Sequence, residues 1–258
     1  MLLAIDCGNT NVVFAVCEGE TIRGTWRAAT DVRRTADEYA VWLTQLMALS
    51  GLDRSAIDGV IIASVVPEAL FNLKTLARRY FNCEALVVGD DGVDTGVKAK
   101  VDRPEEVGAD RIVNVAAARG LYGTPLIIID FGTATTFDIV DSDGDYAGGV
   151  IAPGINLSLE ALRLATAKLP GVAIRRPASV IGKSTVPAMQ SGIFWGYVGL
   201  IEGLVSRIRA EMGVAAGVVA TGGLAPLFQE ATPVIDRVDA DLTLRGLAII
   251  HARNRGSR

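Results

Sequence analysis

The clearest pattern along the chain is a pair of apolar segments interrupted by the same polar turn. Residues 2–16 read LLAIDCGNTNVVFAV and residues 126–140 read LIIIDFGTATTFDIV. In each, an apolar run is followed by Asp-x-Gly, by small polar residues and by a second apolar run, which predicts a β-hairpin with a tight turn. Aligned without a gap, the two segments match at Asp6 and Asp130, Gly8 and Gly132, Asn11 and Thr135, and Val16 and Val140.

A second repeat follows the first in both halves of the chain. Residues 59–71, GVIIASVVPEALF, resemble residues 216–228, AGVVATGGLAPLF. The alignment places together Ala63 and Ala220, Ser64 and Thr221, Leu70 and Leu227, and Phe71 and Phe228. Chance resemblance between Val- and Ile-rich strands is the alternative, but two repeats in the same order favour duplication.

Duplication predicts two similar α/β lobes, one over residues 1–118 and one over residues 119–250. The second half is longer, so we expect an insertion in it near residues 150–185. The basic end of the chain, 251–258, is expected to be a disordered, solvated tail.

The segments between the repeats carry helical patterns. Apolar residues at helical spacing predict a helix over 35–50, with Thr35 as the N-cap and Gly51 as the stop. Residues 104–122 predict a helix with a proline near its start. A third helix over 187–212 carries glycines at four helically spaced positions, Gly192, Gly196, Gly199 and Gly203. These glycines fit either close packing inside a lobe or a subunit interface.

Composition removes several classes of chemistry. The chain has 258 residues, half of them hydrophobic, and a net charge of −4, so no basic excess indicates a nucleic-acid partner. Its apolar start is too short for a signal peptide or a membrane span, and a cytoplasmic protein is expected. His251 is the single histidine and is expected at the surface. Three cysteines without a close pair argue against a disulfide framework or a zinc site.

The two Asp-x-Gly turns are the candidate ligand-binding features. A tight turn presents backbone N–H groups, and glycine lets the backbone approach a triphosphate closely. Asp6 is placed to hold Mg²⁺ through water, because this ion prefers hard oxygen ligands. The turn after Asp130 offers a second set of hydroxyls, which we expect to face the first across a cleft. Gly222 and Gly223 would let a base or a ribose lie against the backbone.

One further sequence resembles a phosphate-binding motif and is rejected. Gly182-Lys183-Ser184 has the end of a P-loop, but that loop requires glycine five positions earlier, where Pro177 stands. No apolar strand is predicted before it either.

Four motifs in order resemble the type III pantothenate kinases. They are Asp6-x-Gly8-Asn9-Thr10-Asn11, Gly108-Ala109-Asp110-Arg111, Asp130-Phe131-Gly132-Thr133-Ala134-Thr135, and Ile181-Gly182-Lys183-Ser184-Thr185 followed by Ala188-Met189-Gln190-Ser191-Gly192. The resemblance runs from residue 3 to about residue 250. It implies the actin-like ATPase fold, an α/β fold of two duplicated ribonuclease-H-like lobes with mixed sheets, flanking helices and an interlobe cleft.

The resemblance also implies an activity, which is ATP-dependent phosphorylation of pantothenate in the first step of coenzyme A synthesis. It implies a homodimer, Mg²⁺, and potassium or ammonium as a monovalent cation. Carried over by position, the ATP phosphate loop comprises Asp6, Cys7, Gly8, Asn9, Thr10, Asn11, Val12 and Val13. Thr133 binds ATP and Asp130 binds the monovalent cation. Pantothenate is bound by Gly108, Ala109, Asp110, Arg111 and Thr185, and Asp110 accepts the proton.

These roles agree with elementary chemistry. The attacking alcohol is a weak acid, so a carboxylate must orient it and accept its proton. At the start of a helix the dipole favours the ionised form of Asp110, and the guanidinium of Arg111 can bind a carboxylate or a phosphate. The chain departs from the family at Val101, where members often have tyrosine, so this contact to pantothenate is expected to be lost or replaced.

Two other functions fit the same fold. One is a regulatory protein that binds ATP without using it, and the other is a kinase for a different small molecule. Asp110 beside an intact phosphate loop favours catalysis, and the stretch from Gly108 to Arg111 favours pantothenate.

Overall fold

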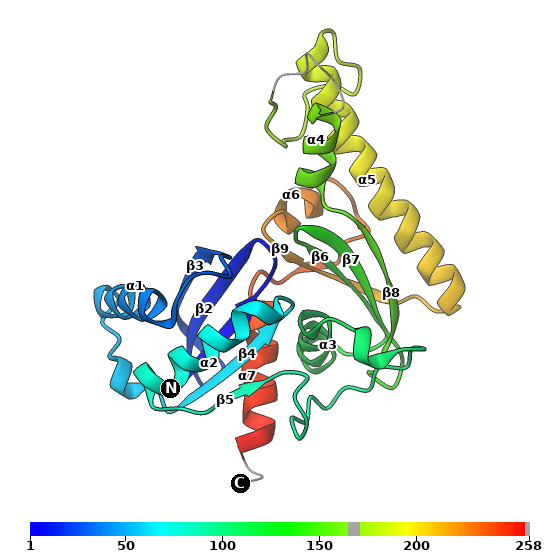
Figure 1. Cartoon of the computed structure of the whole chain (residues 1–258). Helices are drawn as coiled ribbons and strands as arrows, with labels where there is room; N and C mark the ends of the chain where they lie inside the picture. The colour runs from blue at the N-terminus through cyan, green and yellow to red at the C-terminus, as the bar shows by residue number, and fades with distance from the viewer. Residues whose placement is uncertain (165–170, 256–258) are drawn as a thin grey trace. The chain divides into compact units, whose positions relative to one another are not determined.

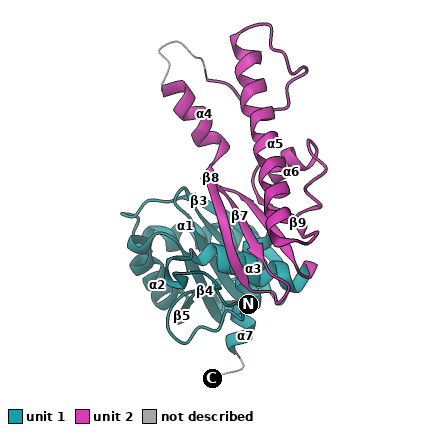
Figure 2. Cartoon of the chain, turned by 90° about the vertical axis from the view of Figure 1, so that its right-hand side faces the viewer, with its two compact units in different colours: residues 1–121, 241–258 teal, residues 122–240 magenta. Residues whose placement is uncertain are grey.

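The computed structural model describes residues 1–164 and 171–255, and the chain folds into two compact units (Figures 1 and 2). The first unit contains Met1–Leu121 together with the residues described from Asp241 onward. The second contains the described residues of Tyr122–Ala240.

The first unit is built on a five-stranded mixed sheet with the strand order β3-β2-β1-β4-β5. Strands β1, β2 and β3 form an antiparallel meander, and β4 and β5 continue the sheet in parallel with β1. The strands are β1 Leu2–Cys7, β2 Asn11–Glu18, β3 Thr21–Ala29, β4 Gly59–Ser64 and β5 Ala85–Val87. The helices are α1 Ala36–Leu49, α2 Pro67–Phe81, α3 Ala109–Tyr122 and α7 Leu242–Arg255, with short 3₁₀ turns at Arg54–Ala56 and Pro104–Glu106.

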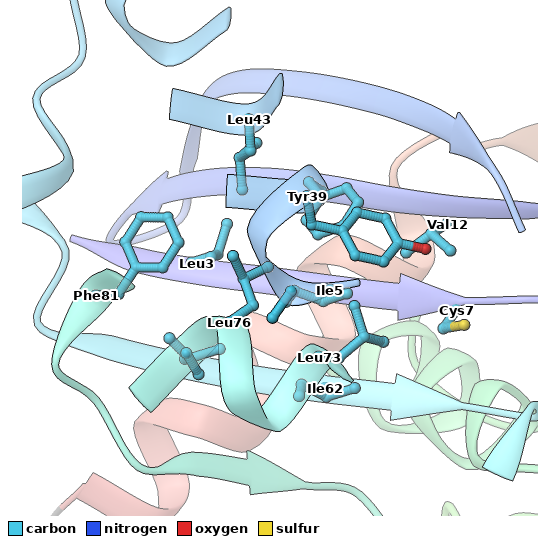
Figure 3. Packing of buried hydrophobic residues seen from close by; sticks show 14 of the residues in the cluster. Leu3, Ile5, Cys7, Val12, Tyr39, Leu43, Ile62, Leu73, Leu76 and Phe81 are labelled. Carbon is cyan, nitrogen blue, oxygen red and sulfur yellow. The ribbon is translucent and has the colours of Figure 1, made fainter. Parts of the chain in front are cut away.

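Alternation along β1 divides its side chains between the two faces of this sheet. Leu3, Ile5 and Cys7 point into a core formed with α1 and α2 (Figure 3). Leu2 and Ala4 belong to the opposite core, which α3 and α7 complete. Each large apolar side chain buried in this way stabilises the fold by about 1.5–3 kcal/mol. Because strand residues alternate, the side chain of Asp6 lies on the face that α3 and α7 cover.

The C-terminal helix α7 belongs to the first unit, which corrects the predicted lobe boundary. Its apolar residues Leu244, Leu247 and Ile250 pack in the same core as Ala4 and Val113. It crosses α3 closely, since a Cβ at Gly246 would lie 2.2 Å from the carbonyl oxygen of Val113. The first three and the last ten residues of the predicted second lobe, 119–250, therefore belong to the first unit.

The predicted disordered tail is wrong for residues 251–255, which form the last turns of α7. Arg253 Nε donates to Asp94 Oδ2 at 2.6 Å, and Arg255 pairs with Asp58 at 2.6 Å. Residues 256–258 lie outside the described residues. The expectation of a surface His251 is also wrong, because the residue is only 9% exposed. It packs where Gly59 has no side chain.

The second unit repeats the topology of the first. Its sheet has the order β10-β9-β6-β7-β8, again an antiparallel meander continued by two parallel strands. The strands are β6 Leu126–Phe131, β7 Ala134–Val140, β8 Tyr146–Pro153, β9 Gly217–Gly222 and β10 Arg237–Val238, and the helices are α4 Ile155–Leu164, α5 Thr185–Met212 and α6 Ala225–Gln229. One face carries a core shared by β6, β7, β9, α5 and α6. Duplication is therefore confirmed.

The gapless alignment of the repeats is wrong by one residue beyond the turn. Cys7 pairs with Val12 in the first hairpin, whereas Phe131 pairs with Thr135 in the second, so the second turn is one residue shorter. The second repeat is also misaligned by one residue, in the opposite direction, since Asp6 pairs with Ala63 and Asp130 with Thr221, not with Ala220. Runs of Val, Ile and Ala look alike when moved by one position, so sequence alone could not fix this register.

The predicted helices are confirmed, with one change. Helix α1 begins in a capping box between Thr35 and Glu38, and Gly51 follows it at φ +72°. The helix predicted over 104–122 is split. Pro104 opens a 3₁₀ turn, Val107 is extended, and α3 begins only at Ala109. Within the described ranges, no helix has both the length and the apolar composition to span a membrane.

Candidate active site

The first turn connects β1 to β2 at the carboxyl end of β1. The N–H of Gly8 donates to the carbonyl oxygen of Asn11 at 2.9 Å and closes the turn. The side chains of Asn9, Thr10 and Asn11 are exposed. The turn thus offers backbone and side-chain donors to a ligand outside the core, as predicted for an anion-binding loop.

The eight predicted loop residues do not all contribute side chains. Asp6 is half-buried and continues the side of β1 that faces α3 and α7. The side chains of Cys7 and Val12 are 1% and 0% exposed and point into the opposite core. Burial raises the pKa of the Cys7 thiol, which keeps it protonated. Cys7 and Val12 can therefore reach a ligand only through their backbone.

Gly8 is not required by the fold of the turn. A Cβ built on it would meet only the carbonyl oxygen of Asn11, at an ordinary contact distance of 3.5 Å. Its φ is not in the left-handed region that favours glycine. Since neither space nor backbone conformation demands glycine here, close approach of a ligand is the remaining physical reason for it.

The start of α3 lies at the same end of the sheet as this turn. The N–H of Val65, which follows β4, donates to the carbonyl oxygen of Cys7 at 3.0 Å. A Cβ on Gly108 would lie 3.5 Å from Val65 Cγ1 and 2.6 Å from Asp110 Oδ1. These successive contacts run from Cys7 through Val65 and Gly108 to Asp110. The structure brings the first turn and Asp110 to one end of one sheet, and places Asp6 on the face that α3 covers.

The electrostatic setting of Asp110 differs from the sequence expectation. Burial raises the pKa of this carboxyl group above its usual value, and this effect exceeds the lowering caused by the backbone N–H and the charge of Arg111. That N–H donates to Asp110 Oδ1 at 2.8 Å. The helix terminus alone was expected to favour the ionised form. Desolvation outweighs it, which makes Asp110 a stronger proton acceptor once it is ionised.

The second turn connects β6 to β7 in the second unit. Gly132 N–H donates to the carbonyl oxygen of Ala134 at 3.0 Å, and the side chain of Thr133 is exposed. Asp130 stands between Thr136 on one neighbouring strand and Thr221 on the other, so three oxygen-bearing side chains share one face. Such oxygens suit a hard cation.

Sequence reasoning missed Tyr197, which supports this second turn. Its hydroxyl lies 2.5 Å from Thr135 Oγ1 and 3.0 Å from the carbonyl oxygen of Pro153. The ring is buried, so α5 ties β7 to the end of β8 beside the turn. A buried tyrosine hydroxyl usually has a hydrogen-bond partner. A tyrosine in a glycine-rich helix was therefore the sequence feature that could have indicated this contact.

Two adjacent glycines, Gly222 at the end of β9 and Gly223 after it, differ in whether their surroundings require glycine. Gly222 has φ +89°, and a Cβ on it would lie 2.6 Å from the carbonyl oxygen of Phe131, so strand packing requires glycine there. At Gly223, apart from its neighbours in sequence, no atom of the described residues lies within 4 Å of the position that a Cβ would take. Of the pair, only Gly223 leaves the backbone open to a base or a ribose.

Thr185 is the exposed first residue of α5. The loop before it folds back tightly, since a Cβ on Gly182 would lie 2.2 Å from the backbone nitrogen of Ala188. Residues 171–184 contain no strand. Gly182 is therefore explained by contact with its own helix, and the rejection of a P-loop at this position agrees with the structure.

Among residues 1–164 and 171–255, no cluster of three or more His, Cys, Asp or Glu side chains forms a ready-made metal cage. Asp6 and Asp130 each supply a single carboxylate at a strand end. Mg²⁺ usually takes one or two protein carboxylates together with substrate phosphates and water, so the single carboxylate of Asp6 fits such an ion.

Solved structures share the fold at low sequence identity. The chain aligns with a protein of Campylobacter jejuni assigned to the Baf family of transcriptional activators, at a TM-score of 0.64 and 18% identity, covering 98% of this chain and 99% of the other. It also aligns with a protein of Sinorhizobium meliloti described as a 2-dehydro-3-deoxygalactonokinase, at a TM-score of 0.63 and 14% identity over 99% and 96% of the two chains. These likenesses, with two duplicated mixed sheets, confirm the actin-like fold class.

Sequence comparisons identify the family. The family model of the type III pantothenate kinases matches residues 2–207. A type III pantothenate kinase of Paramagnetospirillum magneticum is 70% identical over 254 residues, 98% of each chain. Another, of Rhodospirillum rubrum, is 64% identical over 98% of this chain and 99% of its own. The chain therefore belongs to the type III pantothenate kinase family.

Proposed function

We propose that this protein transfers the γ-phosphoryl group of ATP to the 4′-hydroxyl of pantothenate, the first step of coenzyme A synthesis. The observation that carries the proposal is the position of Asp110 at the same end of the first sheet as the turn of residues 8–10. Membership of a kinase family makes the protein an enzyme and excludes the alternative of a non-catalytic ATP-binding protein.

The site residues divide by role. Asp6 and the turn that follows it bind the ATP phosphates, with Cys7 and Val12 contributing only backbone groups. Thr133 and the open backbone at Gly223 bind other parts of the nucleotide. The stretch from Gly108 to Arg111 and the exposed Thr185 bind pantothenate.

Asp110 is the residue that we assign to the chemistry. Its carboxylate oxygen Oδ2 accepts a hydrogen bond from the 4′-hydroxyl and orients the alcohol toward the phosphorus. As the new O–P bond forms and the bond to ADP breaks, the hydroxyl proton passes to Asp110. The second oxygen stays fixed by the N–H of Arg111 at 2.8 Å. Arg111 also supplies a positive charge suited to the pantothenate carboxylate.

Two cations complete the proposal. Asp6 holds Mg²⁺ through water, and this ion neutralises phosphate charge when bound. Asp130 binds potassium or ammonium, for which the threonines on both neighbouring strands supply further oxygens at the same face. We place the enzyme in the cytoplasm, since all three of its cysteines are free thiols, as expected in a reducing compartment.

A coupled ADP-release assay with a panel of alcohols tests the function. We expect turnover with pantothenate and its close amides, no turnover with sugars or acetate, and a marked fall when sodium replaces potassium. Turnover of a sugar at the rate of pantothenate would contradict the substrate assignment. Equal rates in sodium and potassium would remove the role of Asp130.

We also propose that the protein is a homodimer joined through α5 and its surroundings. Nothing within the described chain lies within 4 Å of a Cβ built at Gly192, Gly196 or Gly199, so these glycines do not serve packing inside the unit. Four large apolar side chains of the same unit are exposed, namely Ile151 at 66%, Leu164 at 74%, Val180 at 64% and Ile181 at 72%. Exposed apolar surface of this kind is typical of an interface.

Light scattering on the Gly196→Arg variant tests the dimer. We expect the mass of a dimer for the parent and of a monomer for this variant, because the arginine replaces a close helix contact with a bulky charge. Gly120→Arg is the matched control, since Gly120 is also an exposed helical glycine with open space around it. A parent protein that is monomeric at micromolar concentration would contradict the proposal.

A further inference from the structure

Thr30, one residue beyond β3, makes two hydrogen bonds to the turn of residues 8–10. Its hydroxyl donates to the carbonyl oxygen of Gly8 at 2.6 Å. Its N–H donates to the carbonyl oxygen of Thr10 at 3.0 Å. Two of the three carbonyl groups in this turn are therefore oriented by one residue, which follows β3 and is distant from the turn in the sequence.

These two bonds also fix the direction of two N–H groups. In a planar trans peptide the carbonyl and the following N–H point in opposite directions. Holding the carbonyls of Gly8 and Thr10 toward Thr30 therefore turns the N–H groups of Asn9 and Asn11 away from it. Backbone N–H groups directed to one side of a turn form an anion-binding concavity.

The side chain of Thr30 is suited to this task. Its branched Cβ restricts χ1, so little side-chain entropy is lost when the hydroxyl is fixed toward Gly8. The bond at 2.6 Å is at the short end of the range for hydroxyl donors. Thr30 is only half-buried and belongs to neither core of the first unit, so its hydroxyl contributes little to the packing of the sheet.

We infer that Thr30 is a positioning residue that holds the phosphate loop in the conformation that binds a nucleoside triphosphate. This inference rests on the proposed binding of ATP phosphates by residues 6–13. Thr30 itself touches no reacting atom. Its effect passes through the orientation of the Asn9 and Asn11 amides, so it should alter nucleotide binding and leave the acceptor site unchanged.

Isothermal titration of Mg·ATP, combined with steady-state kinetics, tests the inference on three variants of the full chain. Thr30→Val keeps the shape and removes the donor. We expect it to raise the Kd and the KM for Mg·ATP by about tenfold, the value of one hydrogen bond to a loop in contact with charge, with little change in the KM for pantothenate. Thr30→Ser keeps the donor and should stay within about threefold of the parent. Thr25→Val, an exposed threonine of the same strand, is the matched control and should behave as the parent.

The possible failures are distinguishable. A parent protein that does not bind Mg·ATP would refute the proposed function, and the inference with it. If the parent binds Mg·ATP and Thr30→Val binds it equally tightly, only the role of Thr30 is refuted. The role is also refuted if Thr30→Ser is as impaired as Thr30→Val, or if Thr30→Val weakens pantothenate and Mg·ATP equally.

Discussion

Replacing Asp110 by asparagine should lower kcat by about 10²- to 10⁴-fold, the usual contribution of a positioned general base. Asparagine has nearly the same shape and can still accept the hydrogen bond from the N–H of Arg111, so binding of both substrates should change little. What it cannot do is accept the proton of the 4′-hydroxyl. Steady-state kinetics with pantothenate and ATP measure the effect on kcat and on each KM separately.

The same substitution should leave stability unchanged or raise it at neutral pH. Burial raises the pKa of Asp110 in the folded protein above its ordinary value. The stability that the protonated group contributes is therefore present below the unfolded pKa and is lost as pH rises through the raised, folded pKa. At neutral pH the buried, ionised carboxylate lowers the free energy of unfolding, and the neutral asparagine removes this destabilisation. Thermal unfolding at pH 7 should give an equal or higher Tm for the variant, and the difference should vanish in acid.

Asp102→Asn serves as the control for this pair of measurements, because Asp102 is an exposed carboxylate on the segment before α3. It should change neither kcat nor Tm. The raised pKa also predicts that the acid limb of the kcat/KM profile, which reports the free enzyme, lies above the range of an ordinary aspartate and disappears in Asp110→Asn. A variant with near-parental kcat would remove Asp110 from the chemistry, whatever its effect on stability.

Replacing Gly8 by alanine should reduce kcat/KM for ATP by about 10²-fold, since displacement of a bound group by about 1 Å can cost that much. The folded turn has space for the new methyl group, whose nearest neighbour would be the Asn11 carbonyl oxygen at 3.5 Å. A glycine-to-alanine change at a compatible position stabilises by about 0.4–1 kcal/mol through the unfolded state. Activity and stability should therefore move in opposite directions, which kinetics and thermal unfolding together would detect.

Gly120→Ala is the matched control for this second prediction, as Gly120 is an exposed helical glycine with no atom within 4 Å of its built Cβ. It should be slightly more stable and fully active. If Gly8→Ala keeps full activity, the phosphates do not approach the backbone of this turn. If it unfolds, the turn itself needs glycine, and the ligand is not the reason.

The architecture was largely predictable because its signals are local. Apolar runs broken by Asp-x-Gly determine the two hairpins, and the capping box at Thr35 and Glu38 marks the start of α1. The register between the repeats was not predictable, because it depends on the length of the turn after Phe131 and on Val- and Ile-rich strands that fit equally well one position along. Nor did any local signal show that Leu244 and Leu247 of α7 pack in the core of the first unit.

The candidate site divides in the same way. The exposed polar turn after Asp6 could be predicted from residue types alone, whereas the family resemblance was needed to separate Asp110 from an ordinary surface aspartate. Desolvation of Asp110 depends on tertiary burial, so the helix-terminus argument gave the wrong direction for its pKa. Thr30 and Tyr197 carry no motif, and only the folded chain shows that their hydroxyls meet the two turns.

A crystal structure with pantothenate and a non-hydrolysable ATP analogue tests most directly whether the triphosphate binds at the turn of residues 8–10 and the 4′-hydroxyl at Asp110. Our prediction places phosphate oxygens on backbone N–H groups of residues 9–11, because that of Gly8 closes the turn, and the 4′-hydroxyl of pantothenate within hydrogen-bond distance of the Asp110 carboxylate. Pantothenate bound with its 4′-hydroxyl away from Asp110, or a triphosphate that leaves the turn of residues 8–10 uncontacted, would contradict it.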